Sequence, residues 1–240
     1  MSHLILVRHG KSEWNPDRFT GWVDVNLDKV GKLEAVKSGE LIKEKKINFD
    51  YFFTSFQKRA IDTLKLIINT LNLKIKDTQI IKAYQLNERH YGSLTGLSKS
   101  ETKQKLGEKK VHEFRRSWDV VPEPLSKNSP YHPLNIETYR DVPRECVPST
   151  ESLEQCTSRV LPYFKNEILS RLKDNKNILA SCHGNSIRGC LKYLFNLDED
   201  KITKLEIPTG NPLFISFNDK NEITKCHYLD HERAKDLIAF

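Results

Sequence analysis

Two short apolar segments, near opposite ends of the chain, each lead directly into a histidine and a glycine. Residues 4–7 precede Arg8-His9-Gly10, and residues 177–182 precede His183-Gly184. Branched aliphatic residues without polar alternation are typical of strands buried on both faces, as in a parallel sheet flanked by helices. Open α/β sheets bind ligands beyond the carboxyl ends of their strands. We therefore expect the two strands to lie side by side and to present both imidazoles at one edge.

The rest of the chain alternates apolar strands with amphipathic helices. Such alternation predicts an α/β, three-layer fold with a mostly parallel sheet and helices on both faces. We expect one catalytic α/β domain over residues 1–240, with an irregular excursion at about 120–148, where six prolines fall. The spacing predicts helices over 28–46, 59–71, 98–118, 149–172, 186–195 and 198–205, and further strands over 51–55, 73–81, 213–217 and 223–229. Ser149 or Thr150 is the expected cap of the fourth helix, and Pro162 its expected kink.

Composition sets broad limits on function. The hydrophobic fraction of 38% and the charged fraction of 30% are ordinary for a globular protein, and the net charge of +7 suits an anionic partner. Five widely spaced cysteines form no Cys-x-x-Cys pair, so they predict neither a disulfide framework nor a zinc ribbon. No apolar run approaches the ~20 residues of a membrane helix, and no leader precedes Leu4, so we expect a cytoplasmic protein. The basic stretch 99–116 contains only Phe114 as an aromatic residue, which argues against nucleic-acid binding.

The polar residues near the expected strand ends suit phosphoryl transfer. One neutral imidazole must attack phosphorus in line, while fixed positive groups hold the oxygens on which charge is spread. Arg8, Arg59, Arg115 and Arg116 can supply those groups, because a guanidinium binds phosphate oxygens in pairs. A single loop carboxylate, Glu88, suits proton transfer.

Other chemistries fit the sequence less well. His9, His90, His112 and His183 could in principle hold a metal, but no ligand spacing supports this and the arginines would repel a cation. The chain lacks the phosphate loop, the dinucleotide fingerprint and the nucleophile elbow. We therefore expect no metal and no nucleotide cofactor.

Several local motifs make the assignment more specific. They are Arg8-His9-Gly10 with Ser12, Trp14 and Asn15, Phe19-Thr20-Gly21-Trp22, Lys58-Arg59-Ala60, Leu86-Asn87-Glu88-Arg89-His90-Tyr91-Gly92, Arg115-Arg116 and His183-Gly184-Asn185-Ser186. From about Leu4 to Leu229 the chain resembles the cofactor-dependent phosphoglycerate mutases of the histidine phosphatase superfamily. The triplet at Arg8 is typical of the whole superfamily, whereas the run through Tyr91 and the paired arginines are typical of the mutase branch.

The resemblance implies an enzyme of glycolysis that interconverts 3-phosphoglycerate and 2-phosphoglycerate through a phosphohistidine. It implies 2,3-bisphosphoglycerate as the primer, no metal, and assembly as a homodimer or homotetramer. His9 would be the nucleophile, His183 would stabilise the transferring group, and Glu88 would exchange the proton of the substrate hydroxyl, with a pKa raised by burial. Arg8 and Arg59 would hold phosphoryl oxygens. The substrate-binding residues implied are Ser12, Asn15, Thr20, Gly21, Arg89, Tyr91, Lys99, Arg115, Arg116, Gly184 and Asn185.

Three departures from the family pattern bear on function. Lys11 replaces an acidic or amide residue and favours phosphate binding only if it points inward. Cys182 replaces a smaller residue, and we expect it to be an inert thiol. The chain stops at Phe240, without the longer tail that helps to cover the site in many relatives, so we expect measurable hydrolysis of 2,3-bisphosphoglycerate beside the mutase reaction.

Two alternatives remain open at this stage. A relative that mainly makes or hydrolyses 2,3-bisphosphoglycerate is one, although Gly21 favours the mutase because the other branch tends to have serine there. A non-catalytic protein that binds phosphorylated ligands is the second, since it could use the arginines and leave the histidines idle.

Overall fold

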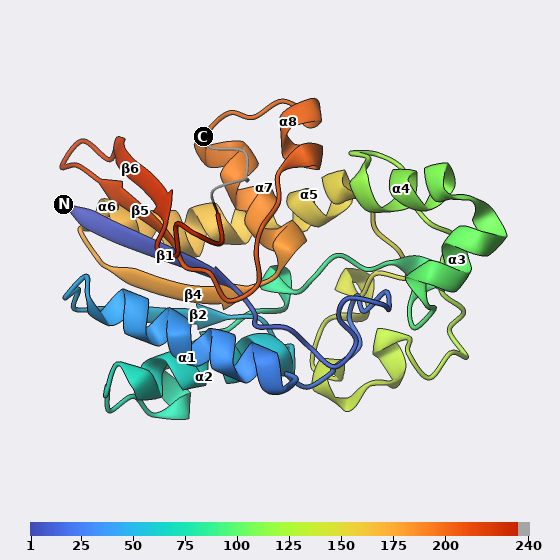
Figure 1. Cartoon of the computed structure of the whole chain (residues 1–240), viewed down its shortest axis with the longest axis horizontal. Helices are drawn as coiled ribbons and strands as arrows, with labels where there is room; N and C mark the ends of the chain where they lie inside the picture. The colour runs from blue at the N-terminus through green and yellow to red at the C-terminus, as the bar shows by residue number, and fades with distance from the viewer. Residues whose placement is uncertain (235–240) are drawn as a thin grey trace.

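The computed structural model describes residues 1–234, in which a mixed six-stranded sheet is covered by helices (Figure 1). The strand order is β3-β2-β4-β1-β5-β6, and β1, β2, β3 and β4 pair in parallel, whereas β5 is antiparallel to both of its neighbours. The expected three-layer, mostly parallel α/β fold is confirmed. The strands are β1 (Ser2–Arg8), β2 (Tyr51–Thr54), β3 (Ile80–Lys82), β4 (Ile178–Cys182), β5 (Leu213–Phe217) and β6 (Ile223–Tyr228).

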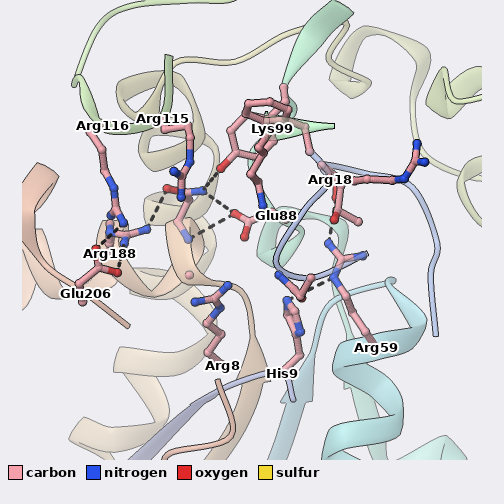
Figure 2. Close-up of a pocket in the computed structure, with 17 residues that line it drawn as sticks. Arg8, His9, Arg18, Arg59, Glu88, Lys99, Arg115, Arg116, Arg188 and Glu206 are labelled. Carbon is pink, nitrogen blue, oxygen red and sulfur yellow. Dashed lines mark hydrogen bonds and ion pairs between the residues drawn. The ribbon is translucent and has the colours of Figure 1, made fainter. Parts of the chain in front are cut away.

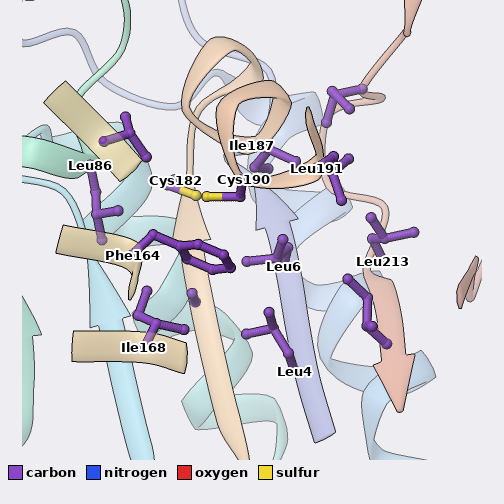
Figure 3. Packing of buried hydrophobic residues seen from close by; sticks show 14 of the residues in the cluster. Leu4, Leu6, Leu86, Phe164, Ile168, Cys182, Ile187, Cys190, Leu191 and Leu213 are labelled. Carbon is purple, nitrogen blue, oxygen red and sulfur yellow. The ribbon is translucent and has the colours of Figure 1, made fainter. Parts of the chain in front are cut away.

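Helices pack on both faces of the sheet because successive side chains of the central strand point to opposite faces. Leu4 and Leu6 of β1 belong to one buried cluster, with α5 (Leu153–Tyr163) and α7 (Gly184–Leu194), which Figure 3 shows from close by. Ile5 and Val7 belong to the other cluster, with α1 (Lys29–Lys43) and α2 (Lys58–Thr70). The unbroken apolar run of β1 therefore reflects a strand that is covered twice.

Several helix boundaries differ from the sequence-based expectation. The helix expected over 98–118 is interrupted at Gly107, whose φ of 83° is left-handed, so that α3 (Lys99–Leu106) and α4 (Glu108–Arg116) are separate. The cap of α5 is Ser152, which accepts from the Gln155 amide, so the expectation of Ser149 or Thr150 was wrong. After Pro162 the α-helical bonding pattern ends, and residues 164–169 are π-helical before α6 (Ser170–Lys173).

The strand expected over 73–81 was wrong for most of its length. Only Ile80–Lys82 pair with β2, and a 3-10 turn, Asp77–Gln79, precedes them. Alternation placed Leu73 and Ile75 correctly against the core, but both are only partly buried and pair with no strand. The spacing of side chains therefore predicted burial without predicting backbone pairing.

The segment 120–148, expected to be an irregular excursion, contains three 3-10 turns, at Pro133–Asn135, Glu137–Tyr139 and Arg144–Cys146. In Figure 1 it lies with α3 and α4 beyond the carboxyl ends of the parallel strands, while α8 (Glu199–Lys204) lies near α7. These segments surround the edge of the sheet at which His9 and His183 emerge. Residues 235–240, on which the expectation about the short tail depends, lie outside the described residues.

Candidate active site

The parallel pairing of β1 and β4 brings the two histidines together. Arg8 is in register with Cys182, and the His9 amide donates to the Cys182 carbonyl at 2.9 Å. The rings of His9 and His183 follow directly, with centroids 5.0 Å apart and planes inclined by 57°. Their exposed fractions are 3% and 0%. Two segments separated by more than 170 residues thus place both imidazoles at one buried point, as the sequence predicts.

The surroundings of His9 set its tautomer and its charge. Nδ1 lies 2.7 Å from the Gly10 carbonyl, which can only accept, so we assign the ring proton to Nδ1. Nε2 is then unprotonated, and its lone pair accepts a hydrogen bond from the Arg59 Nε at 3.2 Å. Burial, with Arg59 and Arg8 nearby, holds the pKa of His9 well below 6.5. His9 is therefore a neutral imidazole whose Nε2 faces the pocket as a nucleophile.

Gly10 is required by a close approach of α1 to the end of β1. A Cβ built on Gly10 would lie 2.2 Å from the carbonyl oxygen of Gly31. The contact with α1 therefore excludes any side chain at this position.

His183 is oriented by Ser55, which follows β2. Ser55 Oγ accepts from the Gln57 amide at 3.1 Å and lies 2.8 Å from His183 Nε2, so its hydroxyl proton is free to be donated to that nitrogen. We therefore assign the ring proton of His183 to Nδ1, a buried atom with no partner in the described part of the chain. Burial, followed by the charge of Arg59, keeps the pKa of His183 well below 6.5. The ring thus offers an unused N–H beside His9.

Two arginines are fixed around this histidine pair. Arg59 is 1% exposed, and its Nη1 and Nη2 each donate at 2.9 Å, to the carbonyls of Val23 and Gly21. Arg8 Nη1 donates to the Ile207 carbonyl at 2.7 Å, while its buried Nε has no partner within residues 1–234. Both guanidiniums are held before any ligand arrives, which lowers the entropy lost on binding.

Glu88 lies at the N-terminus of α7, which begins at Gly184 rather than at Ser186. Its Oε1 accepts from the Asn185 amide at 3.2 Å, from Asn185 Nδ2 at 2.8 Å and from the Arg89 amide at 2.8 Å. Burial would raise the pKa of Glu88, but these donors and the charge of Arg8 outweigh it and lower that pKa. The expected upward shift was therefore wrong for the unliganded protein.

A pocket opens above these groups, and most of the predicted site residues line it (Figure 2). Three do not. Ser12 Oγ donates to Asn15 Oδ1 at 2.7 Å and so orients that side chain, while Arg89 is buried behind Tyr91 and donates to the Phe114 carbonyl. His183 is fully buried, with its ring centroid 5.0 Å from that of His9. The predicted residues that line the pocket are Arg8, His9, Asn15, Thr20, Gly21, Arg59, Glu88, Tyr91, Lys99, Arg115, Arg116, Gly184 and Asn185.

The sequence analysis missed four lining residues, namely Arg18, Phe19, Arg188 and Glu206. Arg188 stands four residues after Gly184 and therefore on the same face of α7, a signal that could have been used. Glu206 belongs to no motif. With these included, seven cationic side chains and two carboxylates line the pocket. Burial, Arg115 and Arg8 lower the pKa of Lys99 to about 8, which reflects this crowding of positive charge.

Two of the three departures from the family pattern, at positions 11 and 182, can be located relative to the pocket. Lys11 is not among the residues that line the pocket, so the outward alternative applies. Burial raises the pKa of the Cys182 thiol to about 12, which supports the expectation of an inert side chain. Within residues 1–234, no cluster of three or more histidine, cysteine or acidic side chains could hold a metal ion, and no helix is long and apolar enough to span a bilayer.

A central sheet with two facing histidines and fixed arginines at one edge defines a phosphoryl-transfer site of the histidine phosphatase type. The family model for the histidine phosphatase superfamily (branch 1) matches residues 4–134 and 126–227, and the chain belongs to this superfamily.

The chain is also similar to individual relatives and to solved structures. The chain is 61% identical to a 2,3-bisphosphoglycerate-dependent phosphoglycerate mutase of Pelagibacter ubique (strain HTCC1062), with all of both chains covered. It is 46% identical to the protein of the same name from Caulobacter sp. (strain K31), with 100% of this chain and 99% of the other covered. Among solved structures, "Mycobacterial hydrolase 1" superposes with a TM-score of 0.68 at 18% identity, covering 94% of this chain and 95% of the other, which supports the fold alone.

Proposed function

We propose that this protein is a phosphoglycerate mutase that depends on 2,3-bisphosphoglycerate and interconverts 3-phosphoglycerate and 2-phosphoglycerate. The full-length relatives with 41–61% identity carry that name. The observation that carries the proposal is the neutral His9 Nε2 beside the unused N–H of His183, in a pocket lined by arginines.

The phosphoryl group to be transferred binds next to His9. Arg8 Nε and His183 Nδ1 are buried donors without a protein partner among the described residues, and phosphoryl oxygens would satisfy both. Arg59 Nε donates to His9 Nε2 at 3.2 Å in the free protein, and it becomes available to a phosphoryl oxygen once that nitrogen bonds to phosphorus. These fixed donors stabilise the charge spread over the oxygens in the transition state.

Transfer to the enzyme forms one bond and breaks one. The lone pair of His9 Nε2 forms a bond to phosphorus while the bond from phosphorus to the ester oxygen breaks, and the leaving oxygen takes a proton from protonated Glu88. The imidazole becomes positively charged, and the Gly10 carbonyl, 2.7 Å from Nδ1, stabilises that charge. The reverse step delivers the phosphoryl group to a substrate hydroxyl, whose proton Glu88 accepts.

The lowered pKa of Glu88 suits transfer of the phosphoryl group from the enzyme to a substrate hydroxyl. A carboxylate that is ionised in the free enzyme is ready to accept the hydroxyl proton. The negative charge of a bound phosphate raises the pKa of a neighbouring carboxylate, so the proton is held until the oxygen leaves again. Glu88 therefore alternates between base and acid without any other titrating group.

The charge of the pocket also suits the primer. The two phosphates and the carboxylate of 2,3-bisphosphoglycerate carry more negative charge than a monophosphoglycerate, and seven cationic side chains line the pocket. When bound, 2,3-bisphosphoglycerate supplies the phosphoryl group that loads His9. Lys99, Tyr91, Arg115 and Arg116 would hold the anionic groups farther from His9.

The alternatives make different demands on the site. A branch that mainly forms 2,3-bisphosphoglycerate tends to have serine at position 21, but Gly21 has a φ of 52° and a Cβ there would lie 3.3 Å from the Tyr91 amide. A protein that only binds phosphorylated ligands would have no use for a neutral His9 with an unprotonated Nε2. We keep homodimeric or homotetrameric assembly and partial hydrolysis of 2,3-bisphosphoglycerate as predictions.

A coupled assay tests the proposal. Conversion of 3-phosphoglycerate is followed with and without 2,3-bisphosphoglycerate, and with a chelator. We expect turnover that requires the primer and is unchanged by the chelator. Absence of conversion with the primer present, or loss of turnover on chelation, would refute the proposal, and release of inorganic phosphate in the same reaction measures the hydrolytic share.

A further inference from the structure

The end of the pocket farther from His9 contains an ion cluster in which Glu206, which has no part in the proposed mechanism, contacts two arginines. Arg116 of α4, Arg188 of α7 and Glu206, which follows α8, meet there, as Figure 2 shows on the side away from His9 and Arg59. Glu206 Oε1 forms an ion pair with Arg116 Nη2, and Glu206 Oε2 lies 3.9 Å from Arg188 Nη2. A carboxylate therefore occupies two guanidiniums of a pocket built for anions.

The two arginines are not held equally. The Arg188 side chain is 9% exposed, and it donates to the Leu205 carbonyl at 2.8 Å and to Asn185 Oδ1 at 3.1 Å, so it stays in place without Glu206. The Arg116 side chain is 20% exposed, and in the described part of the chain its guanidinium hydrogen-bonds only to Glu206, whose own side chain is 50% exposed. The contact between Arg116 and Glu206 is thus the one that can open.

Glu206 offsets positive charge when no ligand is bound. Burial, Arg116 and Arg8 lower the pKa of Arg188 to about 10, and Glu206 opposes that shift. A ligand carboxylate at Arg116 would supply the same negative charge, and the two carboxylates would repel each other if both remained. Only one of them can occupy the guanidiniums at a time.

We propose that Glu206 is an internal counter-anion that holds Arg116 in the unliganded protein and is displaced by the carboxylate of the phosphoglycerate. This inference rests on the proposed function, which gives the substrate a phosphate beside His9 and a carboxylate farther away. Glu206 thereby lowers affinity for ligands whose carboxylate reaches Arg116 and leaves phosphate esters without a carboxylate unaffected. It is a residue that determines specificity and sets substrate affinity.

Binding measurements on the unphosphorylated protein test the proposal. Dissociation constants of 3-phosphoglycerate and glycerol 3-phosphate, which has a hydroxymethyl group in place of the carboxylate, are measured by calorimetry for wild type and Glu206→Gln. We expect 3-phosphoglycerate to bind about threefold more tightly to the variant, the scale of a partly exposed ion pair, and glycerol 3-phosphate to bind equally to both. The control is Glu137→Gln, which removes an exposed partner of Arg140 and should change neither constant.

A second variant separates competition from a general charge effect. In an Arg116→Ala background, Glu206→Gln should no longer strengthen the binding of 3-phosphoglycerate. Equal strengthening for both ligands, or weaker binding of 3-phosphoglycerate, would overturn the inference, the latter because Glu206 would then orient Arg116 for the substrate. If the wild type interconverts phosphoglycerates and either result is found, the inference alone fails. If the wild type neither binds nor converts them, the proposed function fails as well.

Discussion

The contact between Ser55 and His183 gives a prediction whose size can be worked from the structure. In Ser55→Ala, two buried groups lose their hydrogen bond: His183 Nε2, 2.8 Å from Ser55 Oγ, and the Gln57 amide, 3.1 Å away. Each unpaired buried group costs roughly 1–3 kcal/mol, so we expect the free energy of unfolding to fall by about 2–6 kcal/mol. A urea titration at pH 7.5 measures this loss.

The same substitution should change the chemistry of His183. Without the Ser55 hydroxyl, nothing fixes the proton on Nδ1, so the donor beside His9 is present only part of the time. Loss of a fixed donor to developing charge lowers catalysis by about 10²–10³-fold, and we expect a loss of roughly tenfold for a donor that is weakened rather than removed. Single-turnover phosphorylation of His9 gives the rate, and 15N NMR of the imidazoles reports the tautomer.

Ser181→Ala is the matched control. Ser181 is as buried as Ser55, at 0% exposed, but its Oγ has no partner in the described part of the chain. We expect the free energy of unfolding to change by less than about 0.5 kcal/mol or to rise, and the tautomer of His183 to be unchanged. Equal effects of the two substitutions, or an Nδ1-protonated His183 in Ser55→Ala, would refute the role given to Ser55.

Three further predictions follow from the site. Glu88→Gln should lower mutase turnover by about 10²–10⁴-fold but slow His9 phosphorylation by p-nitrophenyl phosphate only slightly, because that leaving group needs no proton; equal losses in stopped-flow assays would contradict this. Stability without ligand should fall as pH drops below 6.5, by about 1.4 kcal/mol per pH unit for each of His9, His90 and His183, because their lowered pKa values (about 3 for His90) keep them neutral in the native state while the unfolded chain binds protons. An equal free energy of unfolding in urea titrations at pH 7.5, 6.5 and 5.5 would contradict this pH dependence. Gly10→Ala should cost about 1–3 kcal/mol or more, because its Cβ would meet the Gly31 carbonyl, and a wild-type melting temperature would exclude that contact.

The sequence was most informative where local pattern and topology coincide. The apolar runs before His9 and His183 predicted buried strands, and the rule that ligands bind at the carboxyl ends of strands placed both histidines at one edge. Arg115 and Arg116 were proposed from the chemistry of phosphate binding, although periodicity alone makes them a solvated helix face. The other substrate-binding residues came from the resemblance to known mutases.

Other features depend on contacts that sequence does not encode locally. Ser55 and His183 are 128 positions apart, and Glu206 meets Arg116 across 90 positions, so no motif contains either pair. The pKa of Glu88 was predicted in the wrong direction because burial can be guessed from sequence, whereas the amides that converge on the carboxylate, such as that of Asn185, are fixed by the fold.

The position of the phosphoryl group on the enzyme tests the central claim most directly. The protein is incubated with 2,3-bisphosphoglycerate, and the modified residue and ring atom are identified by mass spectrometry and 31P NMR. We expect one acid-labile phosphoryl group on Nε2 of His9, because the Gly10 carbonyl keeps the proton on Nδ1. A phosphoryl group on His183, on Nδ1 of His9 or on an acid-stable side chain, or undiminished labelling of a His9→Asn variant, would contradict the account.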